Sequence, residues 1–275
     1  MLRLHPDDEL SGLLGARIAE RRTIHEWPLS CVQKVVLDDG TRLVYKSQLP
    51  PTVEPAFYAA VSSPLLPGYR PLGRLGDCEV MTLDWIDAPL LRDVARTPED
   101  LVAHGRRVVT AIGELPGTAP VYLDLGTPAG WADATGLAVD RLAKLVADGR
   151  FRSIDEPAVE RVRSWVAAPR VVGAVTAAPR LVHGDLTAEQ VFVAPDGYRV
   201  VDWQRPVIGP PDVHVVALLV SRRIPPGPYV PRVAVAVYWF LLLHWAVRAQ
   251  VELFPEFDGP LFERWSAAAV KRLAR

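Results

Sequence analysis

The sequence predicts an α+β protein in two lobes. The smaller N-terminal lobe is expected to hold an antiparallel sheet with one helix, and the larger C-terminal lobe to be mainly helical. Two observations predict this arrangement. Strand patterns gather in the first third of the 275 residues, whereas helical spacing dominates from residue 98 onward. We place the lobe boundary after residue 86, so that the expected lobes are 1–86 and 87–275.

The N-terminal lobe begins with a stretch that does not resemble a signal peptide. Residues 1–22 carry acids and arginines where a signal peptide needs an apolar core, so we expect a surface helix there. Residues 27–47 then alternate β-branched and polar side chains around Asp39 and Gly40. This pattern predicts two antiparallel strands joined by a hairpin turn.

A short helix and two more strands should complete this lobe. Thr52 is a plausible N-cap and Pro55 fits the first turn, which predicts a helix within 52–63. Residues 69–77 and 78–86 read as two further strands.

The rest of the chain is predominantly helical. Helical spacing is found at 98–115, 134–147, 157–167 and from 229 onward. The apolar run 233–247 is 15 residues long, which is shorter than the roughly 20 that a bilayer span needs. We therefore expect a buried helix with His244 in the core. The exception is the segment 180–203, where RLVHGDL is followed by VFVAPDGYRVVDW, which reads as two short strands joined by a turn at Asp196 and Gly197.

The composition argues against several kinds of partner. Hydrophobic residues make up 49% and charged residues 23%, and the 31 basic side chains nearly cancel the 32 acidic ones. This balance provides no basic field for nucleic acid, and no membrane partner is expected. Cys31 and Cys78 are the two cysteines, too few for a disulfide framework, so a reducing cytoplasm fits best.

One segment suggests chemistry. In LVHGDL, Asp185 follows a strand, and Asp202 ends the second strand of the hairpin that comes next. Phosphoryl transfer needs two such carboxylates: Asp185 would accept the proton of an attacking hydroxyl, and Asp202 would hold Mg²⁺ against the nucleotide phosphates. Lys46, near the end of a strand, would neutralise phosphate charge. Structural alternatives are a turn role for Asp185 and an exposed position for Lys46, whereas His183 is expected to be structural.

With these motifs in order, the chain resembles the aminoglycoside phosphotransferase family of small-molecule kinases, which share the protein-kinase-like fold. The matching segments are VYK with Lys46, EPAFY with Glu54, the linker EVMTLDWI at 79–86, HGDLTAEQ and RVVDWQ.

The resemblance implies a nucleotide site in the N-terminal lobe. ATP or GTP would bind with its base on the linker backbone from Asp84 to Ile86, and Glu54 would pair with Lys46. Ser30 and nearby amides would cover the phosphates in place of a Gly-rich loop, which would put Cys31 near the nucleotide.

Three departures from the family pattern stand out. Gln190 occupies the position of a metal-binding Asn, and its longer amide could bind Mg²⁺ directly or through water. Only eight residues separate Lys46 from Glu54, and spacing alone does not favour their pairing. The family usually carries an Asp at the start of the helix that follows the second carboxylate. Here either Asp212 or His214 could stand at that position and brace the catalytic loop.

Two functions are compatible with these residues. The first is a Mg²⁺-dependent kinase that moves the γ-phosphoryl group of ATP or GTP to a hydroxyl of a small molecule or peptide. The alternative is a catalytically weak pseudokinase that acts as a nucleotide-binding or scaffold protein. Cationic antibiotics demand an acidic acceptor site, yet the helical lobe has no dense acidic run and contains arginine pairs at 106–107 and 222–223. The acceptor stays open.

Overall fold

The computed structural model describes residues 1–116 and 118–273 and divides the chain into two compact units. Unit 1 contains Met1–Arg96, Glu114–Tyr122 and Ala188–Arg205. Unit 2 contains Thr97–Gly113, Leu123–Thr187 and Pro206–Arg275. Unit 1 therefore includes a hairpin from late in the sequence. The lobe limits 1–86 and 87–275 stay a prediction.

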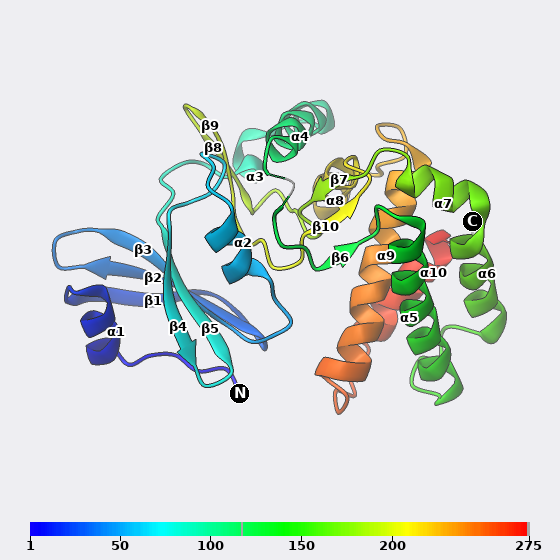
Figure 1. Ribbon diagram of the computed structural model, residues 1–275, viewed down its shortest axis with the longest axis horizontal. Coiled ribbons are helices and arrows are strands. Elements are labelled where there is room, and N and C mark those ends of the chain that lie inside the picture. Colours follow the sequence, from blue (N-terminus) through cyan, green and yellow to red (C-terminus); the bar gives the residue numbers. More distant parts are fainter. Residues whose placement is uncertain (117, 274–275) are drawn as a thin grey trace. The chain divides into compact units, whose positions relative to one another are not determined.

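Unit 1 is built on a five-stranded antiparallel sheet with the order β1-β2-β3-β5-β4 (Figure 1). Its strands are β1 (Ile18–Trp27), β2 (Ser30–Leu37), β3 (Arg42–Gln48), β4 (Tyr69–Leu75) and β5 (Cys78–Asp84). The hairpin at Asp39 and Gly40 and the last two strands are confirmed. So is the α+β class.

The expected helix over residues 1–22 is wrong in its second half. Helix α1 covers only Asp7–Leu14 and ends at Gly15, whose φ of 74° is the left-handed conformation typical of a helix end. The following residues enter β1, an edge strand paired only with β2. Most β1 side chains are exposed, so the strand lacks the alternation that would have predicted it.

Helix α2 (Glu54–Ala60) follows the β2–β3 hairpin as expected, but its N-cap position is Val53. Thr52 still supports the helix start, because its hydroxyl accepts a hydrogen bond from the Glu54 N–H at 3.2 Å. The same hydroxyl donates to Gln48 Oε1 at 3.0 Å, which joins the helix start to β3.

The late segment of unit 1 is the predicted two-stranded hairpin. Strands β8 (Val191–Ala194) and β9 (Gly197–Val200) pair antiparallel, and Gly197, which begins β9 directly after the turn, has a φ of 138°. The hairpin is held on both sides: the Val193 N–H donates to Pro89 O at 2.9 Å and the Val200 N–H donates to Leu65 O at 2.8 Å. The short helix α3 (Leu91–Val94) lies beside β8.

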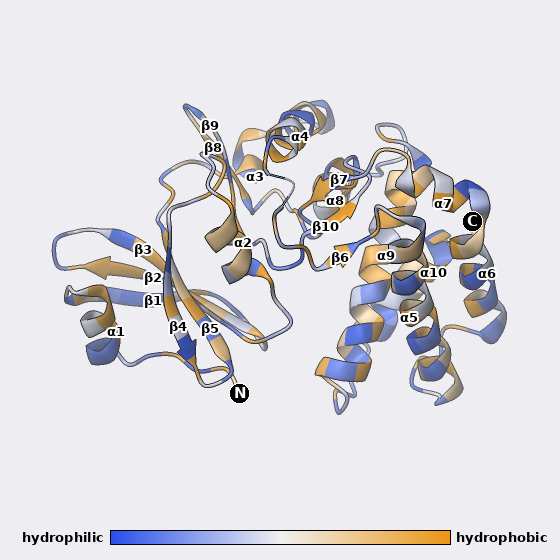
Figure 2. Ribbon diagram, in the orientation of Figure 1, coloured by the Kyte–Doolittle hydropathy of each residue, from blue (hydrophilic) through white to orange (hydrophobic). Residues whose placement is uncertain are grey.

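Unit 2 is mainly helical, as predicted. Its helices are α4 (Pro98–Gly113), α5 (Pro128–Ala147), α6 (Glu156–Ala167), α7 (Pro169–Thr176), α8 (Val213–Ser221), α9 (Arg232–Arg248), the π-helical turn η1 (Ala249–Leu253) and α10 (Leu261–Leu273). A small sheet has the order β6-β10-β7, with β6 at Leu123–Asp124, β7 at Arg180–Val182 and β10 at Val207–Gly209. Outer helices such as α6 carry both blue and orange residues in Figure 2, which fits helices that bury one face.

Helix α9 is the apolar segment that the sequence placed in the core. By length and composition alone, Arg232–Leu253 could cross a membrane, but 61% of its apolar window is buried within the protein. His244 is buried, and its ring lies 6.1 Å from that of Phe240. The expected buried helix is confirmed.

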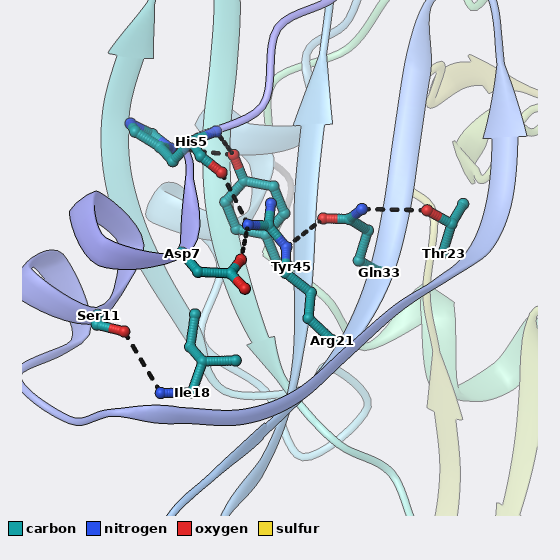
Figure 3. Close-up of polar contacts among 8 residues, drawn as sticks. All are labelled: His5, Asp7, Ser11, Ile18, Arg21, Thr23, Gln33 and Tyr45. Atoms are coloured by element: carbon teal, nitrogen blue, oxygen red, sulfur yellow. Dashed lines mark hydrogen bonds and ion pairs between the residues drawn. The ribbon is translucent and has the colours of Figure 1, made fainter.

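The N-terminal segment is fastened to the sheet of unit 1 by a polar network, which we call the N-terminal latch: His5, Asp7, Arg21, Gln33 and Tyr45 (Figure 3). The His5 N–H donates to the Tyr45 hydroxyl at 3.1 Å. Arg21 donates to the His5 carbonyl at 2.8 Å, to the Asp7 carboxylate at 2.7 Å and to Gln33 Oε1 at 2.7 Å. These hydrogen bonds satisfy the polar groups that α1 and the residues before it shield from water.

Candidate active site

The site in unit 1 is centred on Lys46. Its side chain is 4% exposed, and its ammonium lies 2.5 Å from Glu54 Oε2 and 2.6 Å from Asp202 Oδ1. Glu54 opens α2 and Asp202 follows β9, so strand, helix and hairpin each contribute one charge. The pairing with Glu54 forms despite the short spacing, because the chain turns directly from β3 into α2.

The charges of this cluster depend on each other. Burial lowers the pKa of Lys46, but Asp202 and Glu54 raise it more, so the net shift is upward and the ammonium stays charged. Burial raises the pKa of Glu54 to about 7, against the opposite pull of Lys46. The buried Lys46 ammonium thus forms ion pairs with two carboxylates. Glu54 is fully buried, and Asp202 is one-third exposed.

Gln190 and Asp202 meet at the base of the β8–β9 hairpin. The Val201 N–H donates to the Gln190 carbonyl at 3.1 Å, and the Gln190 side-chain amide donates to Asp202 Oδ2 at 2.8 Å. Asp202 has a φ of 73°, a strained conformation for a residue with a Cβ. The two Asp202 carboxylate oxygens accept from the Lys46 ammonium and from the Gln190 amide nitrogen, so the Gln190 amide oxygen points away from Asp202.

Trp203 ties Asp202 to the helix that carries Glu54. Its indole is completely buried and donates to the Val200 carbonyl at 3.1 Å. It stacks on Phe57 of α2 with ring centroids 4.3 Å apart and planes 9° apart. The hydrogen bond from the Val53 N–H to the Gln204 carbonyl, 3.2 Å long, adds a backbone link between the same two segments.

Ser30 and Cys31 lie on opposite faces of β2, since neighbouring side chains alternate along a strand. Ser30 pairs with Gln48, two residues from Lys46, and so shares the Lys46 face of the sheet. Cys31 pairs with Ser47 and contacts the Thr23 hydroxyl at 4.0 Å. The strand pleat therefore turns the buried Cys31 away from Lys46, and its expected position near the nucleotide stays a prediction.

The linker residues line a hollow within unit 1. Its volume is about 380 Å³, and its walls include Asp84, Ile86, Pro67 and Arg199. The Asp84 N–H donates to the Gly68 carbonyl at 2.9 Å, so this N–H is already hydrogen-bonded within unit 1. The Asp84 carboxylate packs over Gly68, where any Cβ would collide with it.

Asp185 belongs to unit 2, in the loop after β7. Gly184, just before it, has a φ of 86°, which turns the chain sharply at the end of the strand. The His183 N–H donates to His214 Nε2 at 2.9 Å, and His214 Nδ1 lies 2.9 Å from the Pro211 carbonyl. His214, at the start of α8, therefore braces the loop, whereas Asp212 makes no side-chain cap hydrogen bond to this helix.

The bracing histidine is neutral. Burial lowers the pKa of His214 to about 3. Its proton must sit on Nδ1, which donates to Pro211, because Nε2 accepts from the His183 N–H. A neutral ring holding a backbone amide adds no charge beside Asp185.

A second residue near Asp185 was missed by sequence reasoning. Burial and the negative charge of Asp185 raise the pKa of Tyr238, on α9, to about 12. The sequence offers a signal for it in the aromatic residues of the apolar run 233–247, but the apolar pattern of that run predicts only a buried helix.

Four of the predicted residues thus form one cluster in unit 1: Lys46, Glu54, Gln190 and Asp202. Asp185 is held by unit 2, and the chain passes from unit 2 to unit 1 between Thr187 and Ala188. The segment HGDLTAEQ therefore has the Asp185 carboxylate in unit 2 and the Gln190 amide in unit 1.

Comparison with known families agrees with this arrangement. The profile of the APH family, described as the phosphotransferase enzyme family, matches residues 54–250, which is more than half of the chain. The chain belongs to the phosphotransferase enzyme family. This membership makes the protein a kinase-type phosphotransferase with an alcohol group as acceptor. The matched segment includes Glu54, Asp185, Gln190 and Asp202.

Solved phosphotransferase structures share the fold. Macrolide 2′-phosphotransferase from Brachybacterium faecium has a TM-score of 0.59 and 18% identity over 95% of each chain. A choline/ethanolamine kinase family protein from Mesorhizobium loti has a TM-score of 0.58 and 14% identity, over 93% of this chain and 87% of that one. Spectinomycin phosphotransferase, solved with ADP and spectinomycin, has a TM-score of 0.56 and 11% identity over 98% of each chain. Among curated proteins, no sequence matches this phosphotransferase.

Proposed function

We propose that this phosphotransferase moves the γ-phosphoryl group of ATP or GTP to a hydroxyl of a small molecule or peptide and depends on Mg²⁺. The observation that carries the proposal is the buried Lys46 ammonium held between Glu54 and Asp202. A buried cation fixed by a helix carboxylate is a preorganised partner for nucleotide phosphates, and it is charged before the nucleotide arrives.

The residues beside Lys46 suit Mg²⁺ by their chemistry. Mg²⁺ prefers hard oxygen ligands and binds through one or two protein groups while phosphates and water fill the other positions. The Asp202 carboxylate and the Gln190 amide oxygen are such groups. Within 1–116 and 118–273 there is no cluster of three or more His, Cys, Asp or Glu that would favour a fully protein-bound metal. When bound, Mg²⁺ would neutralise phosphate charge.

Asp185 is the proposed catalytic base. As the acceptor oxygen forms its bond to the γ-phosphorus, the bond from that phosphorus to the bridging oxygen breaks and the nucleoside diphosphate leaves. The proton of the acceptor hydroxyl passes to the Asp185 carboxylate. His214 positions the loop through the His183 N–H, 2.9 Å away, without adding a competing positive charge.

The remaining nucleotide contacts follow from the strand faces. Ser30 shares a sheet face with Lys46 and is proposed to lie over the phosphates. Asp84 and Ile86 border the hollow at the linker, and the proposed base contact is made by the backbone of this segment.

A pseudokinase is the second candidate, and one observation favours it. Gln190 turns its amide nitrogen, not its oxygen, toward Asp202, with a hydrogen bond of 2.8 Å. In this state both Asp202 oxygens accept from protein donors, Lys46 and Gln190. A protein that kept these bonds would bind nucleotide without Mg²⁺ and would turn over little.

Calorimetric titration with ATP and with GTP, each with and without Mg²⁺, separates these candidates. The kinase proposal expects binding that tightens with Mg²⁺ and loses this gain in Asp202→Ala. The exposed carboxylate variant Asp8→Ala is the matched control and should bind as the parent does. Mg²⁺-independent binding would favour the pseudokinase, and absence of binding by either nucleotide would contradict both.

A further inference from the structure

The chain that leaves the linker runs beside the segment that carries Gln190, and α3 lies next to β8 (Figure 1). The Val193 N–H donates to the Pro89 carbonyl at 2.9 Å, and Leu90 forms an antiparallel bridge with Phe192. Both contacts lie within unit 1. They join the end of the linker to strand β8, which begins directly after Gln190.

Helix α3 extends this contact to the residues just before Gln190. The Arg92 N–H donates to the Ala188 carbonyl at 3.0 Å, and Ala188 and Leu91 are both buried. On the other side, the Val201 N–H donates to the Gln190 carbonyl. The backbone around Gln190 is therefore held by α3 as well as by its own hairpin.

The side chain of Arg92 adds a contact to the residue next to Gln190. Its Nη1 donates to Glu189 Oε1 at 2.8 Å, and its Nε lies 3.4 Å from Asp93 Oδ1. Two carboxylates therefore fix the guanidinium. Arg92 is 44% and Glu189 65% exposed, and an ion pair this exposed contributes little to the stability of the fold. Its effect is expected on the local orientation of the segment instead.

Glu189 and Gln190 are neighbours whose side chains have different partners. Glu189 is exposed and pairs with Arg92 of α3, whereas the half-buried Gln190 donates its amide to Asp202 Oδ2 at 2.8 Å. A rotation of this short stretch that carried the Gln190 side chain away from Asp202 would also pull Glu189 away from Arg92. The ion pair therefore opposes that rotation and favours the arrangement in which Gln190 faces Asp202.

We propose that Arg92 is a positioning residue for the metal site: its ion pair with Glu189 keeps the Gln190 amide beside the Asp202 carboxylate. The inference rests on the proposed function, because it takes Gln190 and Asp202 as the residues that would hold Mg²⁺. Arg92 acts only through Glu189 in this role, so its loss should change how nucleotide binding responds to Mg²⁺ and not nucleotide binding itself.

Calorimetric titration of the full chain with a non-transferable ATP analogue tests this. The quantity compared is the ratio of the dissociation constant without Mg²⁺ to the dissociation constant with saturating Mg²⁺. We expect Arg92→Ala to lower this ratio about two- to fivefold, the size that an exposed ion pair allows. The dissociation constant without Mg²⁺ should stay at the parent value.

Arg74→Ala is the matched control. Arg74 also belongs to an exposed ion pair of unit 1, with its Nε 3.3 Å from Glu79 Oε1, but this pair lies on β4 and β5, away from Gln190. Its removal should leave the ratio unchanged. Both variants should keep nearly the parent's urea midpoint, so that a changed ratio in Arg92→Ala does not reflect partial unfolding.

Two further variants distinguish positioning from a general loss of charge. Glu189→Ala should lower the ratio as Arg92→Ala does, and the double variant should lower it no further, because both substitutions remove the same contact. Arg92→Lys keeps a cation within reach of Glu189 and should retain most of the ratio.

An unchanged ratio in Arg92→Ala, an equal drop in Arg74→Ala, or additive losses in the double variant would overturn the inference. Failure of the proposed function would look different, because the parent itself would then gain no affinity from Mg²⁺ or would not bind the analogue. That result would overturn the inference together with the proposed function.

Discussion

Lys46 contacts two carboxylates that are far apart in the sequence, Glu54 on the next helix and Asp202 after the late hairpin. Breaking a buried ion pair on one side is strongly destabilising, because the other charge stays buried. Glu54 is completely buried, so the cost of losing Lys46 falls mainly on it.

Lys46→Met should lower the free energy of unfolding by about 3 kcal/mol, the low end of the range for a broken buried pair, since Asp202 is partly solvated. Urea unfolding monitored by circular dichroism measures this. Lys34→Met, on the adjacent strand β2, is the control and should change stability far less. Equal effects of the two substitutions would argue against a buried cation at the centre of the site.

Asp185→Asn should reduce kcat by about 10² to 10⁴, the usual contribution of a general base. The side chain keeps its size, so the dissociation constant for nucleotide with Mg²⁺ should stay within about twofold of the parent value, as single-turnover and calorimetric measurements can establish. A matching loss of nucleotide binding would mean that Asp185 acts on the nucleotide and not on the acceptor.

Gln190→Asn tests the departure from the family pattern. We expect the parent to turn over already, so that restoring Asn raises kcat by less than about tenfold, since Gln offers the same amide oxygen on a longer arm. Steady-state kinetics at several Mg²⁺ concentrations would show this. A parent without turnover and a variant with it would support the pseudokinase instead.

At the level of single elements, the short turn from β7 into the loop that carries Asp185 depends on a buried neutral histidine at the start of α8. The pKa of His214 is about 3 in the folded protein and near 6.5 when the ring is free in water. Between these two pH values the unfolded chain binds a proton on His214 that the folded chain does not bind. The free energy of unfolding must therefore rise with pH across this range.

His214→Gln should remove that dependence. The parent is expected to lose up to about 5 kcal/mol between pH 7 and pH 3 through this residue, since each unit of pKa difference corresponds to about 1.4 kcal/mol. Urea unfolding at a series of pH values, compared between parent and variant, isolates the contribution of His214 to the free energy of unfolding, because the other groups titrate in both proteins. Parallel pH profiles would mean that His214 is not held neutral.

Elements whose pattern of polar and apolar residues reflects the burial of their side chains could be predicted from the sequence. The β2–β3 and β8–β9 hairpins have turn residues at Asp39-Gly40 and Asp196-Gly197 between β-rich runs, and both formed as expected. Strand β1 could not be predicted, because an edge strand tolerates polar residues on both faces and so loses the period-two signal.

The site was predictable where motifs were local and not where partners were distant. Asp185, Gln190 and Asp202 lie within one short stretch, and Lys46 follows from its strand. The orientation of the Gln190 amide depends on Lys46, which is remote in sequence. Likewise, only the fold shows that His214 and not Asp212 holds the loop, and that the charge of Asp185 helps to raise the pKa of Tyr238.

At the scale of the whole molecule, nucleotide binding should show as added stability. A ligand that binds only the folded state at a hundred times its dissociation constant adds about 2.7 kcal/mol. Thermal unfolding with ATP and Mg²⁺ should therefore shift upward in the parent, and this shift should be largely lost in Asp202→Ala. An unchanged shift in that variant would remove Asp202 from the nucleotide site.

The N-terminal latch has a practical consequence for anyone who shortens or tags this chain. Tyr45 and Lys46 are neighbours on β3 and point to opposite faces of the sheet, so one peptide bond separates the latch from the cluster of Lys46, Glu54 and Asp202. Deleting the first nine residues would look like trimming a tail. It would instead expose Tyr45 and loosen strand β3, which positions Lys46. Low activity in such a truncated protein would therefore reflect the missing residues and not the activity of the full chain.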